Sequence, residues 1–370
     1  MRRWLLPEHI EDVLPAEARV IERLRRAILD LFERHGYELV APPMLEYVES
    51  LLSGTGKDMD LATFKLVDRL SGRLLGVRAD HTPQVARIDA HLLNRQGVAR
   101  LCYCGSVLHT VPAGMTRTRE PLQIGAELYG HAGLEADVEI VRLMIDSLKA
   151  AGVGEVHVDL GNPAIYRALA ADTTVDPESA ESLFHAVQQK NAAEAGPLAV
   201  LTGLHGGTET IERARKALPA KPAIREALGA LEKLAAAVAG PGVEVSVDLS
   251  ELGGFNYESG LVFAAFAEGS PEALARGGRY DEVGASFGRA RPATGFTMDL
   301  RQLAARSKGN GRRAAILAPL GEDKGLREEI ARLRAAGEVV IVDLPGHEDS
   351  SNELGCDRKL ERKDGKWRVT

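Results

Sequence analysis

The segment LQIGAELY occupies residues Leu122–Tyr129 and alternates between two kinds of side chain along its length. Such alternation predicts a β-strand, because successive side chains of a strand point to opposite faces. Gln123 and Glu127 are therefore expected on the same face of this strand. The segment LCYC at Leu101–Cys104 alternates in the same way and predicts a second strand, with a polar loop between the two. The sequence thus places two polar side chains on one face of a sheet.

Helices and further strands are predicted on both sides of this pair. Pro15–Arg34 carries apolar residues at a helical period, and an extended stretch follows up to Pro42 and Pro43, because a residue before proline avoids the helical region. The pair Gly277 and Gly278 predicts a tight turn. The other expected elements are a hairpin at 64–67 and 74–78, helices at 82–93, 135–150 and 299–305, and strands at 155–160, 243–249 and 260–266.

Two other segments differ in character from this mixed pattern. Residues 167–240 are Ala-rich and predict an inserted helical subdomain without strands. After an expected linker at 307–311, residues 312–370 predict a small strand-helix-strand unit that closes with a hairpin at Asp364 and Gly365, a favoured tight-turn pair. We therefore expect one domain over residues 1–311 and a second, smaller α/β domain over residues 312–370.

The composition excludes several classes of protein. The chain has 370 residues, with 46 Lys and Arg against 53 Asp and Glu and a net charge of −7, so a broad electrostatic grip on nucleic acid is not expected. Three cysteines predict a reducing compartment, which we interpret as the cytoplasm. No apolar run approaches a membrane span and no secretion signal is recognised, so we expect no membrane anchor.

Cofactor and metal motifs are incomplete in the sequence. Gly54-Thr55-Gly56-Lys57 lacks the earlier glycine and the following Ser or Thr of a phosphate loop. Cys102 and Cys104 have no second Cys or His pair at zinc-like spacing, and alternate cysteines on a strand are commonly buried apolar groups. The sequence therefore predicts no cofactor and no metal site.

Five features in one order resemble the catalytic core of histidyl-tRNA synthetases, which are class II synthetases. They are the opening helix, strand and prolines, Arg78-Ala79-Asp80-His81-Thr82, Gln123-Ile124-Gly125-Ala126-Glu127, Gly254-Phe255-Asn256-Tyr257 and Gly277-Gly278-Arg279-Tyr280-Asp281. The similarity covers roughly residues 5–305. It implies an α+β fold, in which helices flank an antiparallel sheet and the opening helix and strand form a homodimer contact.

The same resemblance indicates that the residues of the synthetase that hold ATP are missing. The positions of the arginine and glutamate of its second motif hold His109 and Val111, and Gln302 stands at the arginine of its third motif, with Arg301 one position early. Gly253 replaces the histidine-specific catalytic arginine. Each hydrogen bond to a charged group contributes about 1.5–3 kcal/mol, so loss of three guanidiniums is expected to abolish adenylation. We therefore expect no catalytic residues in this chain.

The amino-acid pocket of the synthetase, by contrast, is largely retained. The resemblance implies that Asp80, Thr82 and Gln123 hold the ammonium of histidine, that Glu127 recognises its imidazole, and that Tyr257 and Tyr280 lie near the pocket wall, while Arg117 is a candidate replacement cation. Asp80 is one methylene shorter than the synthetase's glutamate, and Glu258 stands where the family has a second tyrosine.

Plainer structural roles remain open for these residues. Asp80 could cap the helix that begins near Thr82, because aspartate is a favoured N-cap residue. Gln123 and Glu127 could form an ordinary polar strand face, and the two tyrosines could be core aromatics.

A synthetase core without an ATP clamp resembles the regulatory subunits of short-form ATP phosphoribosyltransferase. Membership would imply a non-catalytic protein that assembles with a catalytic subunit for the first step of histidine biosynthesis, with histidine as feedback effector. Residues 312–370 contain 12 Lys and Arg and 12 Asp and Glu, so a tRNA-binding tail is not expected. The alternatives are a divergent histidyl-tRNA synthetase with weak aminoacylation activity, a tRNA-binding sensor, and a ligase that adenylates another substrate.

Overall fold

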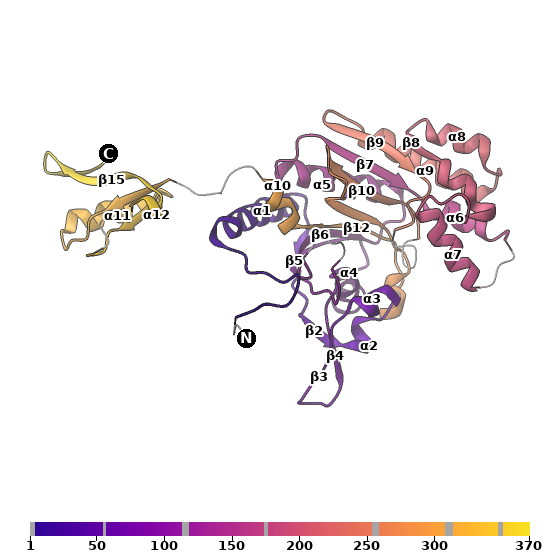
Figure 1. Ribbon diagram of the computed structural model, residues 1–370, viewed down its shortest axis with the longest axis horizontal. Helices are drawn as coiled ribbons and strands as arrows, with labels where there is room; N and C mark the ends of the chain where they lie inside the picture. The colour runs from indigo at the N-terminus through magenta and orange to yellow at the C-terminus, as the bar shows by residue number, and fades with distance from the viewer. Residues whose placement is uncertain are drawn as a thin grey trace. The chain divides into compact units, whose positions relative to one another are not determined.

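A computed structural model describes residues 4–54, 57–112, 118–173, 177–253, 259–307, 314–346 and 351–370. The chain divides into two compact units, one with Met1–Val13 and Ile21–Ser307 and one with Leu14–Val20 and Lys308–Thr370. Figure 1 shows the helices and strands of each unit. The described part contains no helix that is long and apolar enough to cross a membrane.

A nine-stranded sheet forms the centre of the first unit, in the order β1-β5-β6-β12-β11-β10-β7-β9-β8. The strands β5 to β7 and β10 to β12 pair antiparallel, whereas β1 pairs parallel with β5 and β7 parallel with β9. The predicted antiparallel sheet is therefore confirmed at its centre, with a parallel pair toward each end. The strands are β1 (Glu38–Leu39), β5 (Ala99–Ser106), β6 (Leu122–Tyr129), β7 (Val156–Gly161), β8 (His205–Gly207), β9 (Val243–Asp248), β10 (Val262–Ala267), β11 (Ala275–Arg279) and β12 (Ala293–Asp299).

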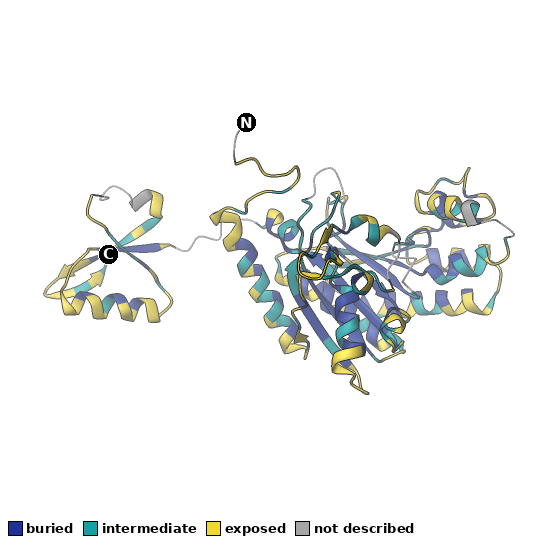
Figure 2. Ribbon diagram, turned by 90° about the horizontal axis from the view of Figure 1, so that it is seen from below, coloured by how far each residue is buried: buried dark blue, intermediate teal, exposed yellow. Residues whose placement is uncertain are grey.

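Helices pack against one face of this sheet. The helix α5 (Leu134–Ala150) contacts β6, β11 and β12, and α9 (Pro222–Val238) contacts β7 and β9. The amphipathic helix α1 (Pro15–Arg34) places the Phe32 ring edge-on to Phe296 of β12, with centroids 5.9 Å apart. In Figure 2 the strands are mostly buried, while the helices carry exposed residues on their outer sides. The opposite face of the sheet carries Gln123 and Glu127.

The first unit also contains a small three-stranded sheet, which precedes the turn with Asp80 along the chain. It has the order β2-β4-β3, with β2 (Leu45–Tyr47), β3 (Lys65–Val67) and β4 (Leu74–Val77), so the predicted hairpin is confirmed. The short helices α2 (Val48–Leu51) and α3 (Lys57–Ala62) lie between β2 and β3 along the chain. The predicted helix at 82–93 is α-helical in α4 (Thr82–Arg87) and π-helical over Ile88–Leu93, and it ends at Asn94 with φ 46°.

The inserted segment is mostly helical, but the prediction that it lacks strands was wrong. Its helices are α6 (Pro163–Ala170), α7 (Pro177–Gln188), α8 (Thr210–Ala217) and α9, with a 3-10 helix at Gly196–Gly203. The strand β8 pairs antiparallel with β9 at the edge of the large sheet. Its sequence, His-Gly-Gly, has no apolar alternation, so only the pairing with β9 defines it as a strand.

The predicted tight turn at Gly277 and Gly278 was also wrong, because both residues lie inside β11. A Cβ atom at Gly277 would lie 2.1 Å from the carbonyl oxygen of Gly295 and 2.6 Å from the Phe263 ring. Glycine is therefore required here by the close approach of neighbouring strands rather than by a turn. The chain turns later, in the segment with the 3-10 helix Val283–Phe287, and continues through β12 into α10 (Leu300–Arg306), which confirms the last predicted helix of the core.

The second unit is a four-stranded sheet in the order β14-β13-β15-β16. Its elements are β13 (Ala315–Ala318), α11 (Lys324–Ala335), β14 (Val339–Val342), α12 (Ser351–Leu354), β15 (Cys356–Lys363) and β16 (Lys366–Val369). The apolar residues Ile316, Leu326, Ile330 and Leu360 form its core. Asp364 and Gly365, with φ 50° and 75°, make the predicted hairpin turn between β15 and β16.

Candidate ligand pocket

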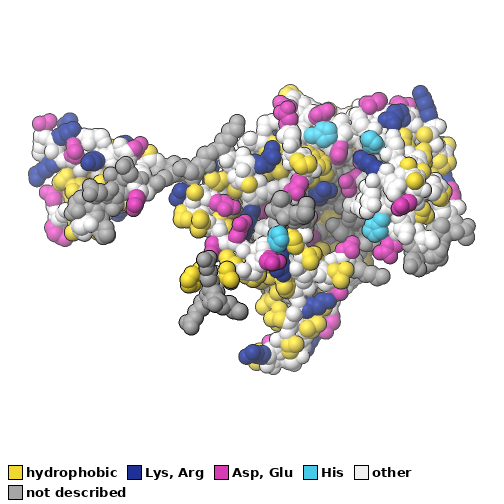
Figure 3. Space-filling model, in the orientation of Figure 1, with side chains coloured by type: hydrophobic (Ala, Val, Ile, Leu, Met, Phe, Trp, Pro, Cys, Tyr) yellow, Lys and Arg dark blue, Asp and Glu magenta, His cyan; other side chains and the backbone are white. Residues whose placement is uncertain are grey.

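A cavity of about 220 Å³ opens on the uncovered face of the large sheet. The surface in Figure 3 is hollowed near its centre, where Figure 1 shows strands of this sheet. The described residues that line it come from β6, β10, β12, β11 and the residue after it, from the start of α4 and the turn before it, and from the segment after β9: Asp80, Thr82, Glu127, Glu251, Gly253, Val262, Phe263, Ala264, Arg276, Gly277, Gly278, Tyr280, Gly295, Phe296 and Thr297.

Glu127 lines this pocket and is itself only 1% exposed to solvent. Its carboxyl accepts hydrogen bonds from the hydroxyls of Thr82 at 3.2 Å, Tyr103 at 3.3 Å and Tyr280. A Cβ atom at Gly295 would lie 1.6 Å from the Glu127 Oε2 atom, so the carboxyl rests directly on this glycine. Three hydroxyls and one glycine thus fix the position of the Glu127 carboxyl.

Burial raises the pKa of Glu127 to about 8, since a charged carboxylate is poorly solvated there. The three hydroxyls lower this pKa and the nearby Asp80 raises it. The pKa of Asp80 is also raised, first by burial, although it accepts a hydrogen bond from the Thr82 backbone N–H at 3.4 Å. Two carboxyls with raised pKa values face one cavity, and a cationic or proton-donating ligand relieves both the poor solvation and the mutual repulsion.

Gln123 lies beside this pocket rather than in its lining. Its Oε1 atom accepts from the backbone N–H of His81 at 3.2 Å and contacts the His81 Nδ1 atom at 2.9 Å. A side-chain hydrogen bond from Gln123 also lowers the pKa of Asp80. In this structure the Gln123 oxygen bonds to His81 at the turn and its side chain bonds to Asp80, and the expected contact with an ammonium stays a prediction.

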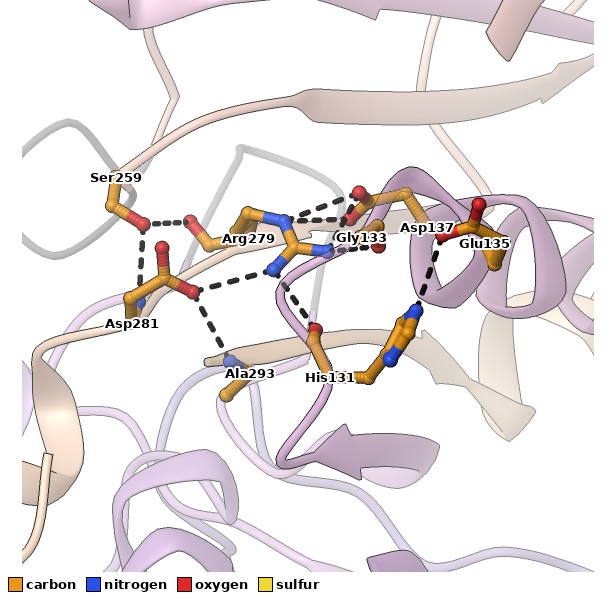
Figure 4. Close-up of polar contacts among 8 residues, drawn as sticks. All are labelled: His131, Gly133, Glu135, Asp137, Ser259, Arg279, Asp281 and Ala293. Atoms are coloured by element: carbon orange, nitrogen blue, oxygen red, sulfur yellow. Dashed lines mark hydrogen bonds and ion pairs between the residues drawn. The ribbon is translucent and has the colours of Figure 1, made fainter. Parts of the chain in front are cut away.

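Arg279, the residue before Tyr280, forms a buried ion pair, which Figure 4 shows. The Arg279 guanidinium bonds to Asp137 of α5, with a shortest distance of 2.7 Å, and donates to the carbonyls of His131 and Gly133. On the other side of Tyr280, the Asp281 carboxylate accepts from the Ala293 backbone N–H at 3.2 Å. Because Arg279 and Asp281 are both fixed, the Tyr280 side chain between them is directed at Glu127.

A second cavity of about 120 Å³ adjoins the first, and Arg276 and Thr297 line both. His109 and Gln302, the residues expected to replace two ATP-binding arginines, also line it. The His109 Nε2 atom bonds to the Ala79 carbonyl oxygen at 2.9 Å, and the Gln302 amide donates to the Ala273 carbonyl oxygen at 3.2 Å. Arg276 is the only Lys or Arg among the described residues that line this second cavity.

The other positions where the synthetase binds ATP add no cation to the described lining of this cavity. Arg301 bonds to Glu120 at 3.4 Å and is not part of the lining. Val111 is 65% exposed. The backbone N–H of Gly253 donates to the Glu251 Oε1 atom at 2.9 Å. Among the described residues, Arg276 is therefore left as the only guanidinium at the second cavity, where the synthetase has several cations for its triphosphate.

Two family models match consecutive parts of this chain. A family model described as histidyl-tRNA synthetase matches residues 9–303, and one described as the ATP phosphoribosyltransferase subunit HisZ C-terminal domain matches residues 313–370. The ATP phosphoribosyltransferase regulatory subunit of Ralstonia nicotianae is 56% identical over 100% of this chain and 98% of its own length. This chain belongs to the family of ATP phosphoribosyltransferase regulatory subunits.

Further relatives in this family agree over nearly the whole chain. The regulatory subunit of Cupriavidus taiwanensis is 57% identical over 99% of this chain and 98% of its own length. A crystal structure described as an ATP phosphoribosyltransferase regulatory subunit/histidyl-tRNA synthetase from Bacillus halodurans matches with a TM-score of 0.81 and 27% identity, over 95% of this chain and 96% of that chain. The predicted class II synthetase-like fold is thereby confirmed.

The structure brings together four of the seven residues predicted to bind histidine. Asp80, Thr82, Glu127 and Tyr280 line the first cavity, and Gln123 adjoins it. Arg117 and Tyr257 lie outside the described residues, as do Glu258 and the rest of the Gly254–Tyr257 motif.

The plainer roles considered for these residues are met in part. His81 rather than Asp80 is the N-cap of α4, although Asp80 bonds to the N–H of Thr82. Tyr280 is a buried core aromatic that also bonds to Glu127. No group of three metal-ligating side chains occurs among the residues that the structure describes.

Sequence reasoning missed three residues of this site. Tyr103 bonds to Glu127 and stacks on the His81 ring at 4.7 Å, and Arg276 and Glu251 line the first cavity. The alternation at Leu101–Cys104 predicted a strand there, but the register that puts Tyr103 on the same face as Glu127 comes from the pairing of β5 with β6. Arg276 could not be found in this way, since β11 was taken for a turn.

Proposed function

We propose that this chain is the regulatory subunit of a short-form ATP phosphoribosyltransferase, without aminoacylation activity of its own, and that histidine binds in the first cavity as the feedback effector. The names of the relatives support the regulatory role. The observation that carries the histidine-binding part is the buried Glu127 carboxyl, held by Thr82, Tyr103 and Tyr280 at the end of a pocket that also contains Asp80.

The chemistry of histidine fits these groups. Its imidazole has a pKa near 6.5 and can donate or accept a proton, and the raised pKa of Glu127 allows the pair to share one proton near neutral pH. Its ammonium is a cation that suits Asp80. The pocket therefore offers a partner for the side chain and for the amino group of one ligand.

Regulation requires that histidine binds two arrangements of the complex with different affinity, because a ligand shifts an equilibrium only through such a difference. Binding in the regulatory chain would then favour a less active arrangement of the assembled transferase. The second cavity supports a non-catalytic role, since Arg276 is the only Lys or Arg of its described lining and the synthetase uses several cations for adenylation.

The resemblance to class II synthetases also supports a homodimer through α1 and the strand before Pro42 and Pro43. We propose this contact together with assembly on the catalytic subunit and without tRNA. A monomer in light scattering at micromolar concentration would contradict the homodimer.

A paired assay tests the proposed function. Histidine-dependent ATP–pyrophosphate exchange is measured on the purified chain, and ATP phosphoribosyltransferase activity is measured after mixing with a short-form catalytic subunit. We expect no exchange, together with stimulation of the transferase that histidine suppresses. Exchange without any effect on the transferase would instead identify a divergent histidyl-tRNA synthetase.

A further inference from the structure

Three arginines on β11 or just before β12 differ in exposure and in the ion pairs that they form. Arg279 and Arg291 have side chains only 9% and 7% exposed, and each forms an ion pair with a buried aspartate, Asp137 or Asp89. Arg276 is 56% exposed, and its described ion pair is with Glu251 at 4.0 Å. An exposed pair at that distance contributes little to stability. Arg276 is thus weakly restrained, unlike its two neighbours.

The position of Arg276 is as distinctive as its loose restraint. It lies on β11 opposite Thr297 of β12 and Ala264 of β10, and the small Ala264 leaves the sheet surface beside it open. Gly278 is two residues further along the same strand face, opposite Gly295, which in turn lies opposite Glu127. Arg276 is therefore on the same sheet face as Glu127 and lies where the two cavities meet.

The carboxyl groups around the first cavity offer no partner for the α-carboxylate of an amino acid. Asp80, Glu127 and Glu251 are acidic, and Arg276 is the only Lys or Arg among the described residues that line the cavity. An α-amino acid carries a carboxylate as well as an ammonium, and a carboxylate that enters a pocket without a cation to face it is poorly solvated there. Gly253, at the position of the synthetase's arginine, supplies no such cation.

We propose that Arg276 binds the α-carboxylate of the amino acid in the first cavity, and that Glu251 is the counter-ion which that carboxylate displaces. This inference rests on the proposed function. A guanidinium suits the role because its planar N–H groups match a carboxylate in a bidentate geometry. Exchange of Glu251 for the ligand carboxylate keeps Arg276 paired in both states, so the pocket selects ligands that carry this group.

The comparison of L-histidine with L-histidinamide tests this assignment. The two ligands share the imidazole and the ammonium but differ in the charge of the carboxyl group. Binding is measured by titration calorimetry on the full-length chain assembled with its catalytic subunit. Arg276→Gln is expected to weaken histidine binding about tenfold to a hundredfold and to change histidinamide binding less than about threefold, since only histidine loses a charged hydrogen bond.

Two further variants sharpen the test. Arg276→Lys keeps the charge but not the bidentate geometry, and we expect it to recover part of the preference for histidine. Glu251→Gln retains an Oε1 acceptor for the Gly253 N–H while removing the competing charge, so it should strengthen histidine binding. Arg69→Gln, in the exposed turn between β3 and β4, is the matched control for loss of one positive charge and should leave both affinities unchanged.

The outcomes separate this inference from the proposed function. Equal weakening of both ligands by Arg276→Gln, or no weakening of either, would overturn the role of Arg276. If Glu127→Gln still weakens both ligands in that case, the histidine pocket stands without it. If the assembled wild-type complex binds neither ligand, the histidine-binding proposal and the assignment of Arg276 are both wrong.

Discussion

The two adjoining cavities on the open face of the sheet differ in how their polar groups are held. In the first, the Glu127 carboxyl accepts from three hydroxyls and rests on Gly295. In the second, His109 and Gln302 bond to backbone carbonyls. The first cavity thus contains a carboxyl fixed by several side chains, while the polar residues of the second bond to the protein's own backbone. We infer that ligand binding can persist on a fold after the residues for its chemistry are gone.

The largest expected effect comes from the ion pair that supports the first cavity. Asp137→Ala leaves the Arg279 guanidinium without its main partner in a buried position and should lower the free energy of unfolding by about 3–5 kcal/mol. Urea denaturation followed by circular dichroism measures this change. Asp146→Ala, at an exposed position on the same helix, is the control and should have little effect.

Glu127 itself should make the stability of the protein depend on pH. Its pKa is about 8 in the folded protein against an ordinary 4.5, so the folded state keeps a proton that the unfolded state has released between these values. The free energy of unfolding should therefore fall as pH rises through this window, by about 1.4 kcal/mol per pH unit from this group.

Glu127→Gln removes that contribution. Denaturation at pH 5.5 and 7.5 should show a larger fall for the wild type than for the variant. The same fall in both proteins would mean that Glu127 is already ionised in the folded state at pH 5.5.

The second cavity should gain nucleotide affinity when cations are restored. His109→Arg combined with Gln302→Arg places two guanidiniums at its lining, and hydrogen bonds to charged groups contribute about 1.5–3 kcal/mol each. We expect ATP binding to strengthen at least about tenfold in calorimetry. Histidine binding should change little, because neither His109 nor Gln302 lines the first cavity. A matched loss of histidine affinity would show that the two cavities are not separable.

Local sequence patterns predicted much of the fold. The alternation at Leu122–Tyr129 predicted β6 and placed Gln123 and Glu127 on one face, and the helical period at Pro15–Arg34 predicted α1. Predictions from these patterns were wrong where the structure of a residue depends on packing or pairing with a segment far away in the sequence. Gly277 fits the close packing of β11 against β12, and β8 exists only through its pairing with β9.

The candidate site was predicted in part for the same reason. The resemblance to histidyl-tRNA synthetases pointed to Asp80 and Glu127, and the structure brings them to one cavity. The engagement of the Gln123 oxygen with His81 depends on a turn 42 residues away in the sequence, so no local pattern could indicate it. Arg276 became a candidate only once its strand had been located between two cavities.

We propose that the first cavity is the histidine-binding site through which the assembled transferase is inhibited. The most direct test is the concentration of histidine that half-inhibits the assembled transferase, compared between the wild type, Glu127→Gln and the control Glu226→Gln, which changes an exposed residue of α9. We predict that Glu127→Gln raises this concentration about tenfold to a hundredfold, whereas Glu226→Gln leaves it unchanged. Equal half-inhibition of all three proteins, with intact assembly, would contradict the claim.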